Sequence, residues 1–228
     1  MMCARRVSER YLSRTLTVPM FPLPRTVLFP AVRLPFYVFE PRYQRMLADV
    51  LDGPGLIGIP QVLPGFESSL AGSPPFTRVL GVGRVNDYVT HEDGTSHIEM
   101  IGLHRVQLIE ELPENVYRRA RVEILDDPVA GDDTAAEIRR RITDAVKRLV
   151  PLAVEDDARV PLERLLEDEE RGLPTVVNTL ATVLIPDPRT RQALLETAGV
   201  ERRGRLLASE IDDLRSRLER DRQSEDEA

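Results

Sequence analysis

The chain has 228 residues, of which 42% are hydrophobic and 30% charged, the balance of a globular protein with one large domain or two small ones. It contains no run of 18 apolar residues and only one cysteine, Cys3, which excludes a transmembrane helix, a disulfide framework and a cysteine-based metal site. No apolar stretch follows the charged N-terminus, so we expect no secretory signal and a cytoplasmic location.

The formal net charge of −7 is spread unevenly along the chain. Residues 1–14 carry a net charge of +3, residues 15–125 a net −2 and residues 126–228 a net −8. Affinity for nucleic acids depends on neutralising phosphates with basic side chains. Neither of the two main segments has a basic excess, so nucleic acid is not the expected partner.

Short strands punctuated by prolines are predicted at the start of the first main segment. They cover 26–29 and 34–39, and because proline cannot donate to a central ladder, we expect edges or bends of a sheet. Pro41 then suits the first turn of a helix over 41–52, which Gly53 ends. Apolar residues recur along this helix at the spacing of one buried face: Tyr43, Met46, Leu47 and Val50.

A hairpin is the clearest element in the middle of the chain. Residues 79–89 and 98–109 are rich in β-formers and meet around Asp93-Gly94, a strong turn signal. The remaining elements of this segment are a buried strand at 56–59, a long loop at 61–76 and a last strand at 117–125. Six or so short strands around a single helix predict a small, bent barrel.

Helical spacing dominates after residue 126. A capping-box sequence from Thr134 to Glu137 predicts the start of the first helix, which Pro151 ends. Helix 174–185 is apolar on most sides and is predicted to be central in a bundle. Three further helices are predicted: 161–171 ending at Gly172, one capped by Asp187 and closed by Gly199, and a last one carrying Leu207, Ile211, Leu214 and Leu218. We expect the charged tail after it to be disordered.

Two short motifs do not fit the structural context that their chemistry needs. Residues 53–58 match G-x-G-x-x-G, but a helix precedes them and a strand follows, the reverse of a dinucleotide site. Residues 91–95 begin like H-E-x-x-H, but Thr95 replaces the second ligand and the segment lies on a hairpin. His91 and His97 flank the same turn, so a weak two-ligand surface site is conceivable, although solvated side chains are favoured. We expect no metal and no cofactor.

The sequence also contains no recognisable set of catalytic residues. There is no phosphate-binding G-x-x-x-x-G-K-[ST] and no G-x-S-x-G. Lys147 occupies a regular helical position, and the carboxylates at 156–157 and 167–170 are interpreted as solvated helix surface rather than a cation site. No nucleophile, base and orienting group come together, so we expect no catalytic residue and no enzymatic activity.

A family resemblance is carried by residues 21–125. Its first half contains Phe21-Pro22-Leu23-Pro24, Val27-Leu28-Phe29-Pro30, Leu34-Pro35-Phe36 and Phe39-Glu40-Pro41-Arg42-Tyr43. Its second half contains Gly81-Val82-Gly83-Arg84-Val85, Asp93-Gly94-Thr95 and Gly102-Leu103-His104-Arg105-Val106. In this order and spacing they resemble the N-terminal, substrate-binding domain of Lon proteases. A looser likeness continues through Leu194-Leu195-Glu196 and 202–207.

The resemblance implies an α+β fold, with a β-rich PUA-like pseudobarrel at 15–125 and a C-terminal α-helical bundle at 130–222. We expect residues 1–14 and 223–228 to be flexible. In full-length Lon proteases this region recognises unfolded substrates, whereas the ATPase and Ser–Lys peptidase domains lie further along. The likeness is therefore to a stand-alone bacterial substrate-binding protein and implies no protease. A similar domain in cereblon, a ubiquitin-ligase receptor, serves recognition without proteolysis.

The expected function is non-catalytic binding of unfolded or exposed apolar protein segments, with a protease or chaperone as a conceivable partner. Such a site needs apolar surface that stays uncovered in the monomer. The 61–76 loop is the first candidate for protein binding, through four apolar residues: Leu63, Phe66, Leu70 and Phe76. The alternative, rated equal, is that these side chains fold back onto the barrel as an Ω-loop.

RNA binding is the second hypothesis, because PUA-like folds also bind RNA. Its support in the sequence is six arginines of the barrel: Arg78, Arg84, Arg105, Arg118, Arg119 and Arg121. A cryptic hydrolase is a third hypothesis, and it would need Lys147. We expect a monomer, because the apolar stripe of the last helix is shorter than two heptads and because two copies of the 126–228 segment, each with a net charge of −8, would repel each other.

Overall fold

The computed structural model describes residues 14–69, 72–113, 116–128, 131–153 and 156–226. These residues form two compact units. In the described part of the chain, the sheet unit contains residues up to Leu28 and Arg33–Leu125, and the helical unit contains Phe29–Val32 and the residues from Asp126 onward. The α+β class predicted from the sequence is confirmed.

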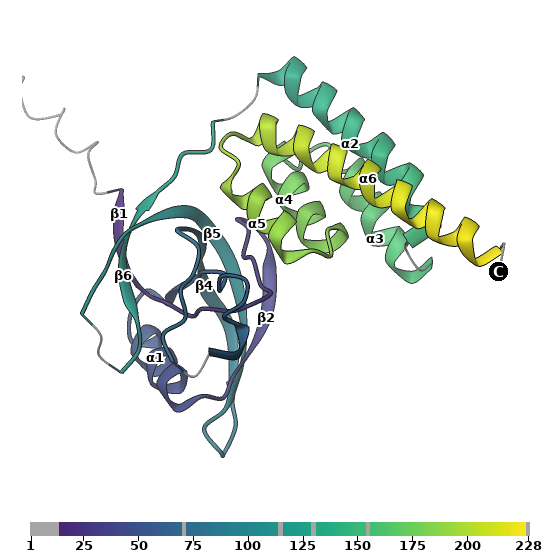
Figure 1. Cartoon of the computed structure of the whole chain (residues 1–228). Coiled ribbons are helices and arrows are strands. Elements are labelled where there is room, and N and C mark those ends of the chain that lie inside the picture. The colour runs from purple at the N-terminus through teal and green to yellow at the C-terminus, as the bar shows by residue number, and fades with distance from the viewer. Residues whose placement is uncertain (1–13, 70–71, 114–115, 129–130, 154–155, 227–228) are drawn as a thin grey trace, which may run out of the picture. The chain divides into compact units, whose positions relative to one another are not determined.

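The sheet unit is built on one antiparallel sheet of six strands (Figure 1). Five strands follow the order β1-β6-β5-β4-β3, and β2 pairs with β5 beside this path. The strands are β1 (Thr15–Pro19), β2 (Arg33–Val38), β3 (Leu56–Ile59), β4 (Val79–Thr90), β5 (Ser96–Glu111) and β6 (Arg119–Ile124). The long β5 strand therefore contacts β2, β4 and β6 along its length.

One predicted strand is wrong, and one strand was missed. Residues 26–29 have no ladder partner, although Val27, Leu28 and Phe29 are buried. The backbone at Leu28 instead lies directly against Gly81 of β4. A Cβ atom on residue 81 would collide with the Leu28 carbonyl oxygen, so only glycine fits there. The missed strand is β1, whose residues Thr15 to Pro19 pair with Glu123 to Arg119 of β6.

The predicted helix and hairpin of the sheet unit are confirmed. Helix α1 (Pro41–Leu51) has Pro41 in its first turn and buries the four predicted residues, Tyr43, Met46, Leu47 and Val50. The β4–β5 hairpin turns at Asp93-Gly94, and Gly94 has a φ of 83°, which suits glycine. The Asp93 carboxylate accepts hydrogen bonds from the hydroxyl and the backbone N–H of Thr95, and these lower the pKa of Asp93.

The helical unit contains five helices in the described part of the chain (Figure 1). They are α2 (Asp132–Ala153), α3 (Asp156–Glu167), α4 (Leu173–Leu184), α5 (Pro188–Glu196) and α6 (Val200–Asp226). Helix α4 is buried over most of its circumference, as predicted, with Val176, Val177 and Leu180 fully inaccessible to solvent. Val183, which the same apolar pattern predicts to be buried, is 59% exposed. Asp187 is the N-cap of α5 and accepts hydrogen bonds from the backbone N–H groups of Arg189 and Thr190.

Several helix boundaries differ from the prediction, and two prolines expected at a helix end lie inside a helix. Helix α2 begins at Asp132 and includes Pro151, while α3 begins at Asp156, includes Pro161 and ends at Glu167, before the predicted Arg171. Helix α5 ends at Glu196, before the predicted Gly199. Pro151 lies in the last turn of α2, where its ring removes one backbone hydrogen bond, and the buried residues of this helix, from Ile138 to Leu149, precede it. Helix α6 continues to Asp226, beyond the apolar stripe that predicted it.

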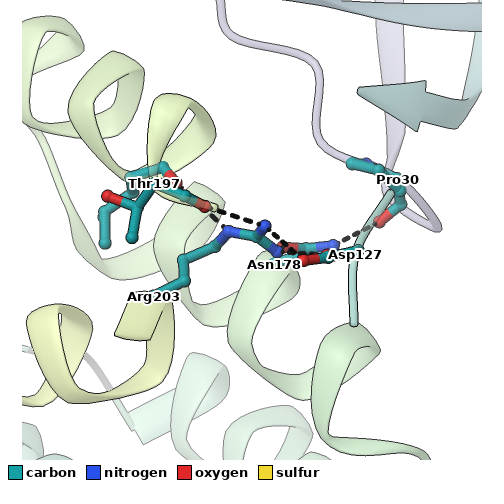
Figure 2. A network of polar contacts seen from close by, with 6 residues as sticks. Pro30, Asp127, Asn178, Thr197 and Arg203 are labelled. Carbon is teal, nitrogen blue, oxygen red and sulfur yellow. Dashed lines mark hydrogen bonds and ion pairs between the residues drawn. The ribbon is translucent and has the colours of Figure 1, made fainter. Parts of the chain in front are cut away.

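A buried arginine organises the polar interior of the helical unit (Figure 2). The Arg203 side chain on α6 is fully buried, and its guanidinium donates to both carboxylate oxygens of Asp127 at 2.8 and 2.9 Å. Its other acceptors are the carbonyl oxygens of Leu194 and Thr197 and the side-chain oxygen of Asn178. Asn178 in turn donates to the Pro30 carbonyl oxygen, so the network also holds the 29–32 segment within this unit.

Candidate protein-binding surface

The 61–76 loop has one strongly exposed member among its predicted binding residues. Phe66 is 44% exposed, Leu63 is half-buried, and Leu70 lies outside the described residues. Phe76 is 8% exposed and packs in the core, with the Arg118 guanidinium 4.1 Å from its ring centroid. Of the described members, Phe66 and part of Leu63 can therefore meet a partner.

Backbone contacts fix both ends of this loop to the sheet unit. The Leu63 N–H donates to the Pro75 carbonyl oxygen, and the Thr77 N–H donates to that of Gln61. Isolated bridges also join Leu23 to Gln61 and Val62 to Phe76. The described part of the loop thus projects Phe66 from an anchored base.

A second apolar surface lies on the exposed face of β2, β4 and β5, near the β4–β5 turn. Its aromatic and aliphatic members are Tyr37, Phe39 and Val89, with exposed fractions of 46%, 59% and 59%. The exposed histidines His91 and His97 complete it. We call these five residues the aromatic–histidine patch.

Strand register brings the patch together from three separate stretches of sequence. Tyr37 of β2 and Val89 of β4 both lie directly opposite His97 of β5. Directly opposite residues point to the same face of a sheet. The ring centroids of Tyr37 and His97 are accordingly 4.7 Å apart, and Phe39 stacks on Tyr37 at 5.8 Å.

Polar side chains border the patch on the same sheet face. Glu99 accepts hydrogen bonds from Arg33 at 3.0 Å and from Asn86 at 2.8 Å. An exposed apolar surface with a polar rim is the usual form of a protein-interaction site. The patch can therefore bury apolar side chains of a partner while the rim stays hydrated.

The two histidines of the patch contact each other. His91 Nε2 and His97 Nδ1 are 2.8 Å apart, a distance at which one ring N–H donates to the other ring nitrogen. Among the residues that the structure describes, no third histidine, cysteine or carboxylate joins them as a possible metal ligand. The pair is therefore treated as part of the patch.

The other residues considered from the sequence lie apart from this surface. Lys147 is exposed on α2, and Asp168 accepts a hydrogen bond from Arg171 at 2.7 Å, which lowers the pKa of Asp168. The side chains of residues 156–157 lie outside the described part of the structure.

Most of the arginines weighed for RNA binding are engaged within the sheet unit. Arg118 pairs with Glu111 at 2.7 Å, and Arg121 pairs with Glu110 at 2.9 Å. Arg78 donates to the Leu108 carbonyl oxygen, and Arg105 is only 3% exposed. RNA binding would need these guanidinium groups to contact phosphates, but they are already paired or buried within the sheet unit. No other feature of the described residues favours RNA.

The sequence profile described as the ATP-dependent protease La (LON) substrate-binding domain matches residues 17–213. The chain belongs to this family. It is a substrate-recognition domain by family, and the match covers most of the sheet unit and most of the helical unit.

Curated relatives of this LON domain are bacterial Lon proteases. Lon protease 1 of Herpetosiphon aurantiacus is 23% identical over 229 residues, covering 91% of this chain and 28% of that protein. The Lon protease of Dictyoglomus thermophilum is 23% identical over 201 residues, covering 86% of this chain and 25% of that protein. The chain thus spans about a quarter of the length of these relatives.

Two solved structures share the fold of this LON domain. The Lon N-terminal domain protein from Xanthomonas campestris has a TM-score of 0.60 at 19% identity, covering 85% of this chain and 98% of that one. The N-terminal domain of the Mycobacterium avium complex Lon protease has a TM-score of 0.63 at 15% identity, covering 87% and 99%. Within the described residues of this LON domain, no helix is both long and apolar enough to cross a bilayer.

The sequence contained only part of the signal for the aromatic–histidine patch. Alternation along 33–38 separates Tyr37 from the buried Phe36 and Val38, and the sequence places His91 and His97 on either side of one predicted turn. What sequence reasoning missed is the pairing of β2 with β5, because about 60 residues separate the two strands.

Proposed function

We propose that this LON domain recognises protein clients by binding apolar segments that unfolding exposes, and that the aromatic–histidine patch is its main contact surface. The observation that carries the proposal is the exposure of the stacked rings of Tyr37 and Phe39 and, on the same side of the sheet across His97, of Val89. Folded monomers seldom leave such contiguous apolar surface uncovered unless a partner binds it.

The 61–76 loop is the second contact that we propose. Phe66 is its exposed aromatic residue, and the anchored base of the loop limits the conformational entropy lost when a client binds. We further propose that the domain acts without catalysis, in the cytoplasm, as a monomer, and delivers clients to a protease or chaperone. The supporting observations are the family match and the surface described above.

The test is a binding titration with a permanently unfolded client, such as reduced and carboxymethylated α-lactalbumin, followed by fluorescence anisotropy. Tyr37→Ser combined with Phe39→Ser should weaken binding at least tenfold, about 1.4 kcal/mol. Both side chains are strongly exposed, so the midpoint of thermal unfolding should stay nearly unchanged.

Val183→Ser is the matched control, because Val183 is 59% exposed on α4, outside the patch. This variant should bind the client as tightly as the unaltered protein. Binding that falls steeply with salt and is insensitive to the Tyr37 and Phe39 substitutions would contradict the proposal and favour an electrostatic partner.

A further inference from the structure

Strand β2 is an edge strand beside the aromatic–histidine patch. Among the described strands it pairs with β5 alone, from Arg33↔Ile101 to Val38↔Ser96, without a register shift. No turn or loop of the described chain makes a backbone hydrogen bond to residues 33–38. Its second edge is therefore unpaired within the part of the chain that the structure describes.

The hairpin fixes which backbone groups of β2 point toward this second edge. The His91 N–H donates to the Thr95 carbonyl oxygen at 2.8 Å, so these two opposite residues form a hydrogen-bonded pair. Bonded and non-bonded pairs alternate along an antiparallel ladder. Val89↔His97, two positions further, is thus a bonded pair, and the backbone groups of His97 point to β4.

It follows that Tyr37↔His97, on the other side of His97, is a non-bonded pair. The N–H and C=O groups of Tyr37 consequently point away from β5, and by alternation those of Arg33 and Pro35 do as well. Non-bonded pairs bring side chains closer, in agreement with the 4.7 Å between the Tyr37 and His97 rings. Pro35 also fits, because proline in a sheet occurs where its nitrogen faces away from the ladder.

This edge offers three carbonyl acceptors, on Arg33, Pro35 and Tyr37, but only two N–H donors, on Arg33 and Tyr37. Proline and charged residues on an edge strand commonly protect it from pairing with other chains. Pro35, however, removes only one donor and leaves the row of acceptors complete. The side chains of these same residues emerge on the outer face, where Tyr37 belongs to the patch.

We infer that an extended segment of the client adds to the sheet as a strand along the free edge of β2, with alternate apolar side chains packed on the patch. This inference rests on the proposed function and specifies its substrate class: extended segments with alternating apolar residues, in place of helical or globular ones. Strand addition supplies affinity through main-chain hydrogen bonds, whereas the patch selects the apolar positions.

The direction of the added strand determines which amides of the client face β2. In an antiparallel arrangement, a client residue opposite Tyr37 has its side chain on the patch and its N–H directed toward β2. In a parallel arrangement, the residues with side chains on the patch have N–H groups directed away from β2. In either case only every second amide of the client meets the three acceptors.

Selective N-methylation of a peptide tests this arrangement without altering the protein. The probe is a fluorescein-labelled octapeptide with valine or phenylalanine at odd positions and threonine or serine at even positions, compared with two versions of the same sequence. One version carries N-methyl groups on the odd amides and the other on the even amides. One version should lose at least tenfold in affinity for the unaltered protein, while the other binds within about twofold of the parent peptide.

Loss from methylation at the apolar positions would assign the antiparallel direction, and loss at the polar positions the parallel one. Equal affinity of the two methylated peptides, whether both bind or both fail, would overturn strand addition. The proposed function would survive that result if the parent peptide still depended on Tyr37 and Phe39, and it would fail if the parent peptide did not bind at all. A dimer in light scattering that the peptide cannot dissociate would make a second copy the occupant and refute the inference.

Discussion

The Arg203–Asp127 ion pair, in which Arg203 is fully buried and the Asp127 side chain is 24% exposed, makes a sharp prediction about the stability of the helical unit. Asp127→Ala removes the carboxylate that accepts two hydrogen bonds from Arg203, whose side chain is fully buried. Removing one partner of a buried pair costs about 3–5 kcal/mol, because it leaves an uncompensated charge in the interior. Arg203 retains three neutral oxygen acceptors, from Leu194, Thr197 and Asn178, so we expect the lower end, about 3 kcal/mol.

Urea unfolding, followed by circular dichroism at 222 nm, measures how far Asp127→Ala lowers the free energy of unfolding of the helices. The matched control is Asp212→Ala, which breaks the Arg148–Asp212 pair of the same unit, where the two side chains are 50% and 39% exposed. Exposed pairs contribute about 0–1 kcal/mol. If Asp127→Ala lowers the free energy of unfolding no more than Asp212→Ala does, the Arg203 network does not stabilise the unit as argued.

Four other outcomes are expected. Leu180→Ala should cost about 2–5 kcal/mol in urea unfolding, because Leu180 is fully buried in α4 and its loss leaves a cavity; a cost below about 0.5 kcal/mol would contradict this. Shortening the 61–76 loop around the exposed Phe66, between its anchored ends, should leave the thermal midpoint nearly unchanged and weaken binding of an unfolded client about tenfold in anisotropy, whereas unfolding of the domain would make the loop structural. Burial alone would raise the pKa of Asp187, but hydrogen bonds from Thr190 and Arg189 lower it below its usual value. Its stabilisation is therefore present above about pH 4 and is lost as pH falls through the folded-state pKa. Asp187→Ala should cost about 1 kcal/mol at pH 7, and a gap that did not narrow as the pH falls below about 4 would refute the capping role. Light scattering should give a mass near the 25.8 kDa of one chain, and a doubled mass that Leu214→Glu halves without loss of helicity would make the α6 stripe an interface.

Local patterns predicted the elements whose stabilising contacts lie close in sequence. Helix α1 follows from its proline start and one apolar face, the hairpin from Asp93-Gly94, and the α5 N-cap from Asp187. In each case the decisive residues lie within a dozen positions of one another. Such short-range signals determine where an element begins, turns or ends.

Features that depend on long-range contacts could not be predicted in the same way. Residues 26–29 have the composition of a strand, yet they bury Leu28 against Gly81 and find no ladder partner. Arg203 is fully buried because Asp127, 76 positions earlier, lies beside it, and no local pattern indicates that pairing. The aromatic–histidine patch has the same origin, since its members meet only through the β2–β5 and β4–β5 registers.

The most direct test of client recognition by the patch is backbone amide chemical-shift mapping of the isotope-labelled protein during titration with the unfolded client. We predict that the largest changes occur at Tyr37, Phe39, Val89, His91 and His97, with smaller ones at Phe66. Changes confined to α2–α6, or spread evenly over the surface, would contradict the assignment of this face as the client-binding surface.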